Sequence, residues 1–302
     1  MEQSELPLIL VEDFIGYQEK LFKRAGDEIA LGYYKNPDIK KFEKEVEGRK
    51  SIYSDVDIEI QNFLTQQTLD KYPSVGIISE EDSEKILPNC EYIWMIDPLD
   101  GTRGYLEGIE HFVLQGALIH VASRMPVAAI VYKPLDLDEE RKEHNKRTCL
   151  YTVIKDKKRE LFAHYNNDDR ITTKLNVSDK QSLPKSTMLA GRYGSTQTTM
   201  ERLEQLPLER IVHLGSSGNK LATIARGDAE AYVRFHDEPP LHEWDTAAGV
   251  LMVTEAGGKA TDAYGNPLVY LQEDFAHRKG LVISNGKVHD ELLKKLEELR
   301  TK

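Results

Sequence analysis

Two carboxylates three positions apart, Asp97 and Asp100, could hold a metal ion together. They follow a short apolar run, Tyr92-Ile93-Trp94-Met95-Ile96, and belong to the turn Asp-Pro-Leu-Asp-Gly-Thr. The run predicts a buried strand, and its end would deliver both acids into one pocket. Hard divalent cations such as Mg²⁺ prefer carboxylate, carbonyl and water oxygens, so Asp97, the Leu99 carbonyl and Asp100 are candidate ligands.

The residues between and after the two acids suit such a site. Pro98 fixes φ and stiffens the turn, while Gly101 lets backbone come close to a bound group. Thr102 places a hydroxyl next to them. An ordinary surface turn is the alternative, because Asp, Pro and Gly dominate turns.

Further carboxylates occur where predicted elements begin or end. A second short strand, 75–79, is followed directly by Glu80, which repeats the design at Asp97. Asp245 begins a predicted helix, where helix capping explains it equally well. Asp55 begins another, where a favourable interaction with the helix dipole is the structural explanation.

The elements that must position these acids fall into two groups. Residues 8–34 and the segment after Asp55 predict helices, residues 36–50 a charged loop, and residues 75–164 a run of strands that includes a hairpin over 111–132. Beyond residue 185, strands alternate with helices, which is typical of an α/β arrangement. We therefore expect an α+β N-terminal lobe, 1–185, carrying most of the metal ligands, and an α/β C-terminal lobe, 186–302.

Composition limits the function classes. The 302 residues carry 40 basic and 51 acidic side chains, for a formal net charge of -11. An acidic excess disfavours nucleic acid and anionic membranes as partners. No signal-like segment and no apolar run near 18 residues is visible, so we expect a cytoplasmic protein, either a monomer or a homodimer.

Three spaced blocks carry a resemblance to a known family. They are Glu80-Glu81, then Asp97-Pro98-Leu99-Asp100-Gly101-Thr102, then Trp244-Asp245-Thr246-Ala247-Ala248-Gly249 with Glu255-Ala256-Gly257-Gly258 after it. Together they resemble the lithium-sensitive, Mg²⁺-dependent phosphatases of the inositol monophosphatase-like superfamily. The resemblance implies that family's α-β-α-β-α layered sandwich.

The resemblance also implies a set of metal ligands. Glu80, Asp97 and the Leu99 carbonyl would hold one Mg²⁺, and Asp97, Asp100 and Asp245 a second. Paired cations suit the chemistry, because a phosphate ester is already anionic when water must attack it in line.

The same resemblance assigns roles around the turn. A third, weaker ion would lie near Glu80 with Asp55. Thr102, supported by Asp55, would take or orient the proton of the attacking water, and the N–H groups of Gly101 and Thr102 would hold phosphoryl oxygens.

Three other residues favour one branch of the superfamily. Ser217, Lys220 and Arg234 resemble the trio with which 3'(2'),5'-bisphosphate nucleotidases bind a second phosphate away from the metals. The planar guanidinium of Arg can donate two hydrogen bonds to one phosphate. A bound anion would explain why a lysine, which acts as a point charge, lies at the start of a helix. We therefore expect hydrolysis of adenosine 3',5'-bisphosphate, or of its phosphosulfate relative.

Alternatives remain open at this point. They are an inositol polyphosphate 1-phosphatase, an inositol monophosphatase and an inactive sensor of a metal-bound phospholigand. The nucleophile loop of haloacid-dehalogenase phosphatases is excluded, since it needs an acid where Pro98 stands. One departure from the family is the region 133–158, which is charged and poor in glycine where relatives carry a Gly-rich hairpin.

Overall fold

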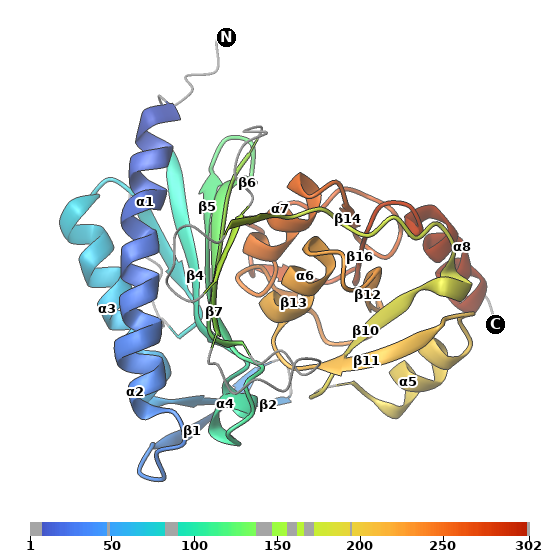
Figure 1. Cartoon of the computed structure of the whole chain (residues 1–302), viewed down its shortest axis with the longest axis horizontal. Coiled ribbons are helices and arrows are strands. Elements are labelled where there is room, and N and C mark those ends of the chain that lie inside the picture. The colour runs from blue at the N-terminus through green and yellow to red at the C-terminus, as the bar shows by residue number, and fades with distance from the viewer. Residues whose placement is uncertain are drawn as a thin grey trace.

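The protein has five layers, in the order helix, sheet, helix, sheet, helix (Figure 1). The structure is a computed structural model, and it describes residues 8–46, 49–81, 90–136, 147–155, 162–165, 172–193 and 195–300. Within the charged region 133–158, residues 137–146 and 156–158 therefore lie outside the described residues.

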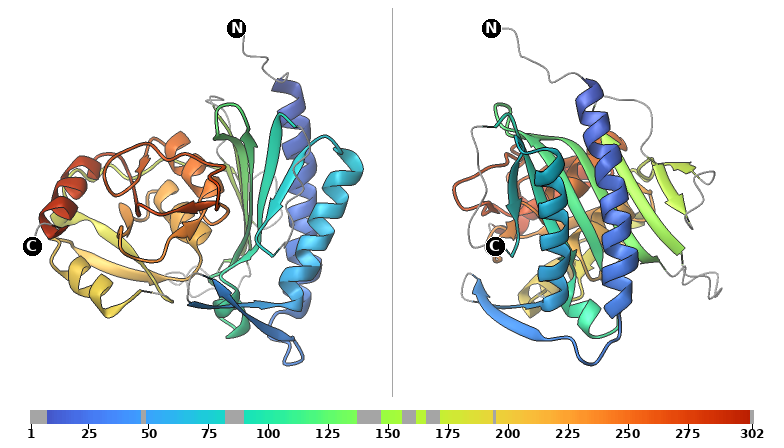
Figure 2. Two further views of the ribbon diagram at one scale, coloured as in Figure 1. Left: turned by 180° about the vertical axis from the view of Figure 1, so that it is seen from behind. Right: turned by 90° about the vertical axis from the view of Figure 1, so that its left-hand side faces the viewer.

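The first layer consists of two long helices that lie side by side (Figure 2). The chain runs from α1 (Leu8–Arg24) through a π-helical turn (Ala25–Ala30) into α2 (Leu31–Tyr33), as the helical period over 8–34 predicts. The second helix is α3 (Asp55–Lys71), whose start at Asp55 is confirmed. Their apolar faces, with Phe22 and Ile60 among them, are buried against the first sheet.

That sheet has seven described strands in the order β3-β4-β5-β6-β7-β8-β9. Only β3 and β4 run parallel; every later pair is antiparallel, including the predicted hairpin β5–β6. The strands are β3 (Gly76–Ser79), β4 (Tyr92–Asp100), β5 (Val113–His120), β6 (Met125–Asp136), β7 (Arg147–Ile154), β8 (Phe162–Tyr165) and β9 (Thr172–Lys174).

The prediction of a charged loop over residues 36–50 is wrong. Strands β1 (Lys41–Val46) and β2 (Arg49–Ser54) form an antiparallel hairpin there. Its apolar content is small, and the rings of Phe42 and Tyr53 stack on each other across the strands. Pairing between the two strands, rather than burial of an apolar face, specifies the hairpin.

The middle layer and the second sheet come from the later part of the chain. Helices α6 (Ser217–Ala225) and α7 (Ala247–Glu255) pack between the two sheets, and they are buried on nearly every side. The second sheet has the order β11-β10-β12-β16-β14, with β10 parallel to β11 and β12. Its strands are β10 (Thr187–Gly191), β11 (Arg210–Leu214), β12 (Ala231–Arg234), β14 (Lys259–Thr261) and β16 (Leu281–Ser284).

The outer layer covers the far face of the second sheet. It contains α5 (Gln197–Glu204) and α8 (His289–Arg300), which share a separate apolar cluster with the strands. Short elements complete the chain: α4 (Thr102–Leu106), a 3₁₀ turn (Leu183–Lys185), β13 (Leu241–His242) and β15 (Ala276–His277). The expected α-β-α-β-α sandwich is thus confirmed.

The two sheets divide the sequence between β9 and β10, on either side of residue 185. One apolar cluster nevertheless joins residues of both sheets through α6 and α7. The assignment of two lobes, 1–185 and 186–302, therefore stays a prediction.

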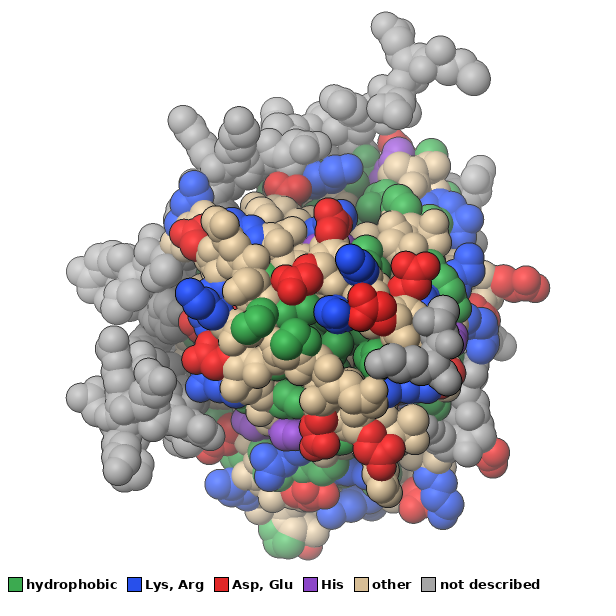
Figure 3. All heavy atoms as spheres, turned by 90° about the vertical axis from the view of Figure 1, so that its right-hand side faces the viewer, with side chains coloured by type: hydrophobic (Ala, Val, Ile, Leu, Met, Phe, Trp, Pro, Cys, Tyr) green, Lys and Arg blue, Asp and Glu red, His purple; other side chains and the backbone are tan. Residues whose placement is uncertain are grey.

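Acidic and basic side chains alternate over the face that lies to the right in Figure 1 (Figure 3). Among the described helices, none is both long and apolar enough to cross a membrane.

Candidate active site

Strand β4 delivers Asp97 and Asp100 to the boundary between the first sheet and the middle helices. Its pairing with β5 is regular up to Asp97 and shifts register before Asp100, so the Pro98-Leu99 step bulges out of the ladder. The bulge lets two acids three positions apart point into one space. Both side chains are buried.

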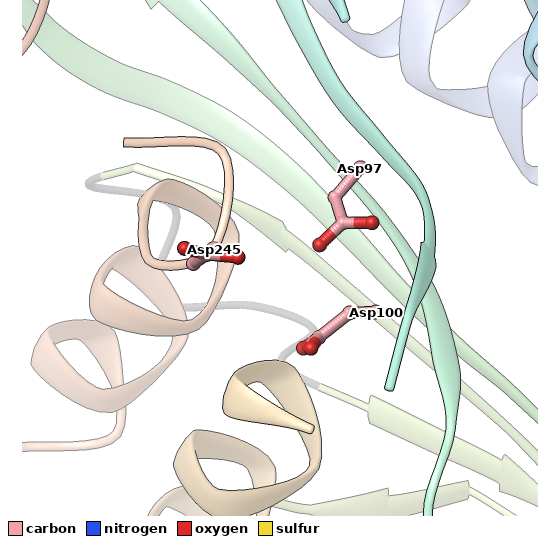
Figure 4. A group of neighbouring side chains, drawn as sticks. All are labelled: Asp97, Asp100 and Asp245. Carbon is pink, nitrogen blue, oxygen red and sulfur yellow. The ribbon is translucent and has the colours of Figure 1, made fainter. Parts of the chain in front are cut away.

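Asp245 reaches the same space from the loop before α7 (Figure 4). One carboxylate oxygen from each of Asp97, Asp100 and Asp245 lies within 4.8 Å of the others. Glu80 joins the group, because it follows β3, which runs parallel to β4, and its carboxylate is close enough to that of Asp97 to raise the pKa of Asp97. The structure thus brings together four acids that are 165 positions apart in sequence at their extremes.

The electrostatics of this cluster are unfavourable without cations. Burial, and then the carboxylates of Glu80, Asp100 and Asp245, raise the pKa of Asp97 well above its usual range. Burial is also the main cause that raises the pKa of each of the other three acids. Oxygen ligands with an excess of buried negative charge are the donor set that a hard divalent ion requires.

The residue that supports Thr102 is Asp57, and the expectation that it is Asp55 is wrong. Thr102 Oγ1 lies 2.7 Å from Asp57 Oδ1 and 3.0 Å from the Leu99 carbonyl oxygen, so its single proton lies between two acceptors. The other oxygen of Asp57, Oδ2, accepts hydrogen bonds from the Ser54 N–H and hydroxyl. Burial, partly offset by these hydrogen bonds, raises the pKa of Asp57 to about 6.

Asp55 belongs to a different environment. It lies in the first turn of α3, and its Oδ1 atom is buried with no hydrogen-bond partner in the described part of the chain. Its charge acts on Tyr33 and Tyr105. The signal for Asp57 was present in the sequence, because Ser54 and Asp57 have the spacing of a capping box, which fixes an acid at the third helical position.

The N-terminus of α6 is directed at Asp100. Ser216 caps this helix by accepting from the Asn219 N–H, and its hydroxyl donates to Asp100 Oδ2 at 2.7 Å. The Gly218 N–H donates to the same oxygen at 2.6 Å. Ser217, which sequence reasoning selected, is buried beside them. Ser216 is a site residue that sequence reasoning missed.

Lys220 lies inside the site rather than at a distance from it. Its ammonium group donates to the Ser216 carbonyl at 2.9 Å and lies 5.1 Å from the centre of the Tyr232 ring. Burial lowers the pKa of Lys220 to about 8, against the opposing effect of Asp100 and Asp245.

Arg234 is close enough to Lys220 to help lower that pKa. Its guanidinium donates twice to the Pro239 carbonyl, at 3.0 and 2.8 Å, and lies 3.6 Å from a Glu238 oxygen. It therefore holds the loop that leads to Asp245 while remaining beside the site.

Gln115 and Lys44 are two further residues that sequence reasoning missed. The buried amide of Gln115, opposite Asp97 on β5, lies 3.1 Å from Asp100 Oδ2 and 3.3 Å from the Asp245 carbonyl. Lys44, from the unexpected β1–β2 hairpin, contacts Glu80 and Glu81. No motif in the sequence singles out either one.

Known proteins are similar to this chain both in sequence and in fold. The model of the inositol monophosphatase family matches residues 11–301. The fructose-1,6-bisphosphatase/inositol-1-monophosphatase of Thermotoga maritima is 28% identical over 288 residues, which are 95% of this chain and 97% of that protein. The 3'(2'),5'-bisphosphate nucleotidase CysQ of Buchnera aphidicola is 31% identical over 221 residues, 72% and 73% of the two chains.

Solved structures agree on the architecture. The IMPase of Thermotoga maritima superimposes with a TM-score of 0.74 at 25% identity, over 96% of this chain and 98% of that one. The extragenic suppressor protein suhB of Bartonella henselae gives a TM-score of 0.73 at 23% identity, over 96% and 99%, and shows the fold alone. By the match of the family model over residues 11–301, its layers and its buried acidic cluster, this chain belongs to the inositol monophosphatase family of metal-dependent phosphatases.

Proposed function

We propose that this phosphatase is a Mg²⁺-dependent 3'(2'),5'-bisphosphate nucleotidase, which removes the 3'-phosphate of adenosine 3',5'-bisphosphate or of its 5'-phosphosulfate relative. The observation that carries the proposal is the pair of basic side chains, Lys220 and Arg234, next to the acidic cluster. A substrate with a second phosphate needs cationic groups beyond the metals, and a simple monoester does not.

The burial of Lys220 supports this reading. Its side chain is 4% exposed, and burial alone would make an ammonium unfavourable. A dianionic phosphate beside it would favour the charged form. Arg234, whose side chain is 13% exposed, can present its outer edge to the same ligand. The named activity of the Buchnera aphidicola relative agrees with this choice.

The acids fit two divalent ions. Asp97 would be shared, with Glu80 and the Leu99 carbonyl on one side and Asp100 and Asp245 on the other. When bound, Mg²⁺ supplies Lewis acidity that activates water and stabilises charge on the leaving oxygen. Gln115 would keep Asp100 oriented through its amide hydrogen bond.

The chain's own residues would handle the proton and the phosphate. Thr102 accepts the proton of the attacking water as its own moves toward Asp57, whose pKa of about 6 suits an acceptor near neutral pH. The N–H groups of Gly101 and Thr102 would bind phosphoryl oxygens.

A substrate panel tests the proposal. We expect purified protein with Mg²⁺ to release phosphate from adenosine 3',5'-bisphosphate with a kcat/KM at least about tenfold above that for inositol 1-phosphate or fructose 1,6-bisphosphate. Preference for fructose 1,6-bisphosphate or inositol 1-phosphate would instead favour the activity named for the Thermotoga maritima relative. Absence of turnover on all three would support the inactive sensor.

The variant Arg234→Gln tests the second-phosphate site. It should raise KM for the bisphosphate by about tenfold or more, with kcat changed much less, because it removes binding rather than chemistry. Arg202→Gln is the control, since Arg202 pairs with Asp237 on the surface. Equal losses on the bisphosphate and on inositol 1-phosphate would mean that Arg234 only holds the Pro239 loop.

A further inference from the structure

We infer that the ammonium group of Lys44 takes the place of a third divalent ion beside Glu80, so that the site holds two such ions rather than three. The inference rests on the two-ion site proposed above, and it concerns one corner of it. The family resemblance places a third ion near Glu80 with Asp55. In this chain that corner contains a tethered cation, and Asp55 does not contribute to it.

The β1–β2 hairpin directs Lys44 into this corner. Lys44 Nζ lies 3.5 Å from Glu80 Oε1 and makes a closer ion pair with Glu81 Oε2. The same ammonium lies 5.4 Å from the centre of the Tyr53 ring. Only 26% of the Lys44 side chain is exposed, and only 3% of the Glu81 side chain.

Strand geometry explains why this lysine, and not its neighbours, points inward. Side chains alternate between the two faces of a strand, so Phe42 and Lys44 share one face, and Glu43 lies on the other. Tyr53, opposite Phe42, lies on the same face as Lys44. On the outer face Lys50 pairs with Glu43 at 2.7 Å, where the two side chains are 78% and 58% exposed.

The charges around the site agree with two divalent ions. Among the described residues, six carboxylates and three cationic side chains act on one another there. When all are ionised, six negative and three positive charges leave three negative charges, which two divalent ions already more than offset. The carboxylates are those of Asp57, Glu80, Glu81, Asp97, Asp100 and Asp245, and the cations are those of Lys44, Lys220 and Arg234.

A third divalent ion on Glu80 would therefore meet two obstacles. The oxygen that it needs already has an ammonium 3.5 Å away, and like charges repel strongly in a partly buried site. Glu81, the next acid along the chain, is engaged by the same ammonium. The lysine would supply positive charge at this corner at every magnesium concentration.

Counting bound Mn²⁺ tests the inference without using turnover. We expect equilibrium dialysis, or the electron paramagnetic resonance signal of free Mn²⁺, to give about two ions per chain for the wild type and about three for Lys44→Gln. The third ion should bind Lys44→Gln at least about tenfold more tightly than any third ion binds the wild type. Lys44→Arg keeps the charge and should return the count to that of the wild type.

Lys50→Gln is the matched control, because it removes a lysine from the outer face of the same hairpin. It should bind the same number of ions as the wild type. Three ions of similar affinity on the wild type would overturn the inference, and so would a count for Lys44→Gln that does not rise. The wild-type count decides the matter even if Lys44→Gln fails to fold.

The two proposals fail in different ways. Mn²⁺ counting uses no nucleotide, so a protein that binds two ions but rejects adenosine 3',5'-bisphosphate would refute only the substrate. A protein that hydrolyses the bisphosphate with three ions bound would refute only the role of Lys44. If Mn²⁺ does not bind the wild type at all, both are overturned.

Discussion

Thr102 and Asp57 belong to different helices and meet through one hydrogen bond of 2.7 Å. That bond gives the Thr102 hydroxyl a direction, because a hydroxyl with a fixed acceptor on one side offers its lone pairs on the other. Asp57 is itself held by Ser54 at the start of α3. The capping interaction at the start of α3 thus holds Asp57 in position for the proposed proton transfer.

Asp57→Asn should lower kcat by about 100-fold or more, since the removal of a general base costs on this order. Asp55→Asn, two residues away in the same helical turn, should keep kcat within about threefold, because its main role is with the helix dipole. Steady-state rates with Mg²⁺ and a bisphosphate substrate check both variants. An equal loss of kcat in both variants would mean that Asp55 also acts in the site, and it would contradict the role that the hydrogen-bond geometry gives to Asp57.

Individual residues show how far sequence reasoning reaches. Glu80, Asp97, Asp100 and Asp245 were selected because each follows or begins a predicted element, and the structure brings all four together. Asp55 and Asp57 could not be separated by periodicity, since both lie in the first turn of one helix. The capping-box spacing with Ser54 distinguishes Asp57, and the side-chain contact with Thr102 places it in the site.

At the scale of elements, the turn after β4 depends on close approach of two backbones. Gly101 has a φ of +98°, and a Cβ atom there would lie 2.5 Å from the His111 carbonyl oxygen. Gly257, after α7, has a similar φ of +93°, but its nearest neighbour, a methyl group of Val177, would be 3.8 Å away. A comparison of alanine variants at the two glycines therefore separates the cost of a positive φ, which both share, from the cost of the close contact, which only Gly101 has.

Gly101→Ala and Gly257→Ala should therefore differ. Both variants pay for a left-handed residue, roughly 1–2 kcal/mol. Gly101→Ala must also displace the His111 backbone or the turn that holds Asp100 and Thr102, so its kcat should fall by about tenfold or more. Thermal unfolding and steady-state rates measure the two effects, and a Gly257→Ala enzyme with the same loss of kcat would contradict this account.

The β1–β2 hairpin marks the limit of prediction for elements. The segment from residue 41 to 46 reads Lys-Phe-Glu-Lys-Glu-Val, which alternates weakly and is mostly charged. A charged segment predicts a solvated loop unless its partner strand is known, and pairing across a turn is not visible in one strand's composition. The element that supplies Lys44 was for this reason missed.

At the scale of the whole molecule, the layers explain why acids from residue 80 to residue 245 can meet. The ends of β3 and β4 face the starts of α6 and α7, so three acids at the ends of these strands and two helix starts share one space. The three sequence blocks could identify this arrangement through their resemblance to a family. Periodicity alone could not, because it says which face of an element is buried but not which elements face each other.

The stability of the whole molecule should depend on a histidine near this space. His277 is 4% exposed, and its Nε2 lies 3.0 Å from the hydroxyl of Thr246, the residue after Asp245. Burial lowers the pKa of His277 to about 4, whereas an unfolded histidine titrates near 6.5. Below pH 6.5 the unfolded chain binds a proton at this histidine, whereas the folded protein does not. The contribution of His277 to the free energy of unfolding is therefore complete above that pH and is lost as the pH falls toward 4.

His277→Gln removes this proton linkage. Between pH 7 and pH 4.5 the free energy of unfolding should fall by about 2 kcal/mol more in the wild type than in the variant, as the 2.5-unit difference in pKa requires. Chemical denaturation at a series of pH values measures the difference, and His213→Gln, which changes a histidine exposed on β11, serves as the control. The hydrogen bond to Thr246 connects His277 to the segment that carries Asp245. If the free energy of unfolding changed with pH equally in the wild type and in His277→Gln, the packing around this segment would have to accommodate a charged imidazole.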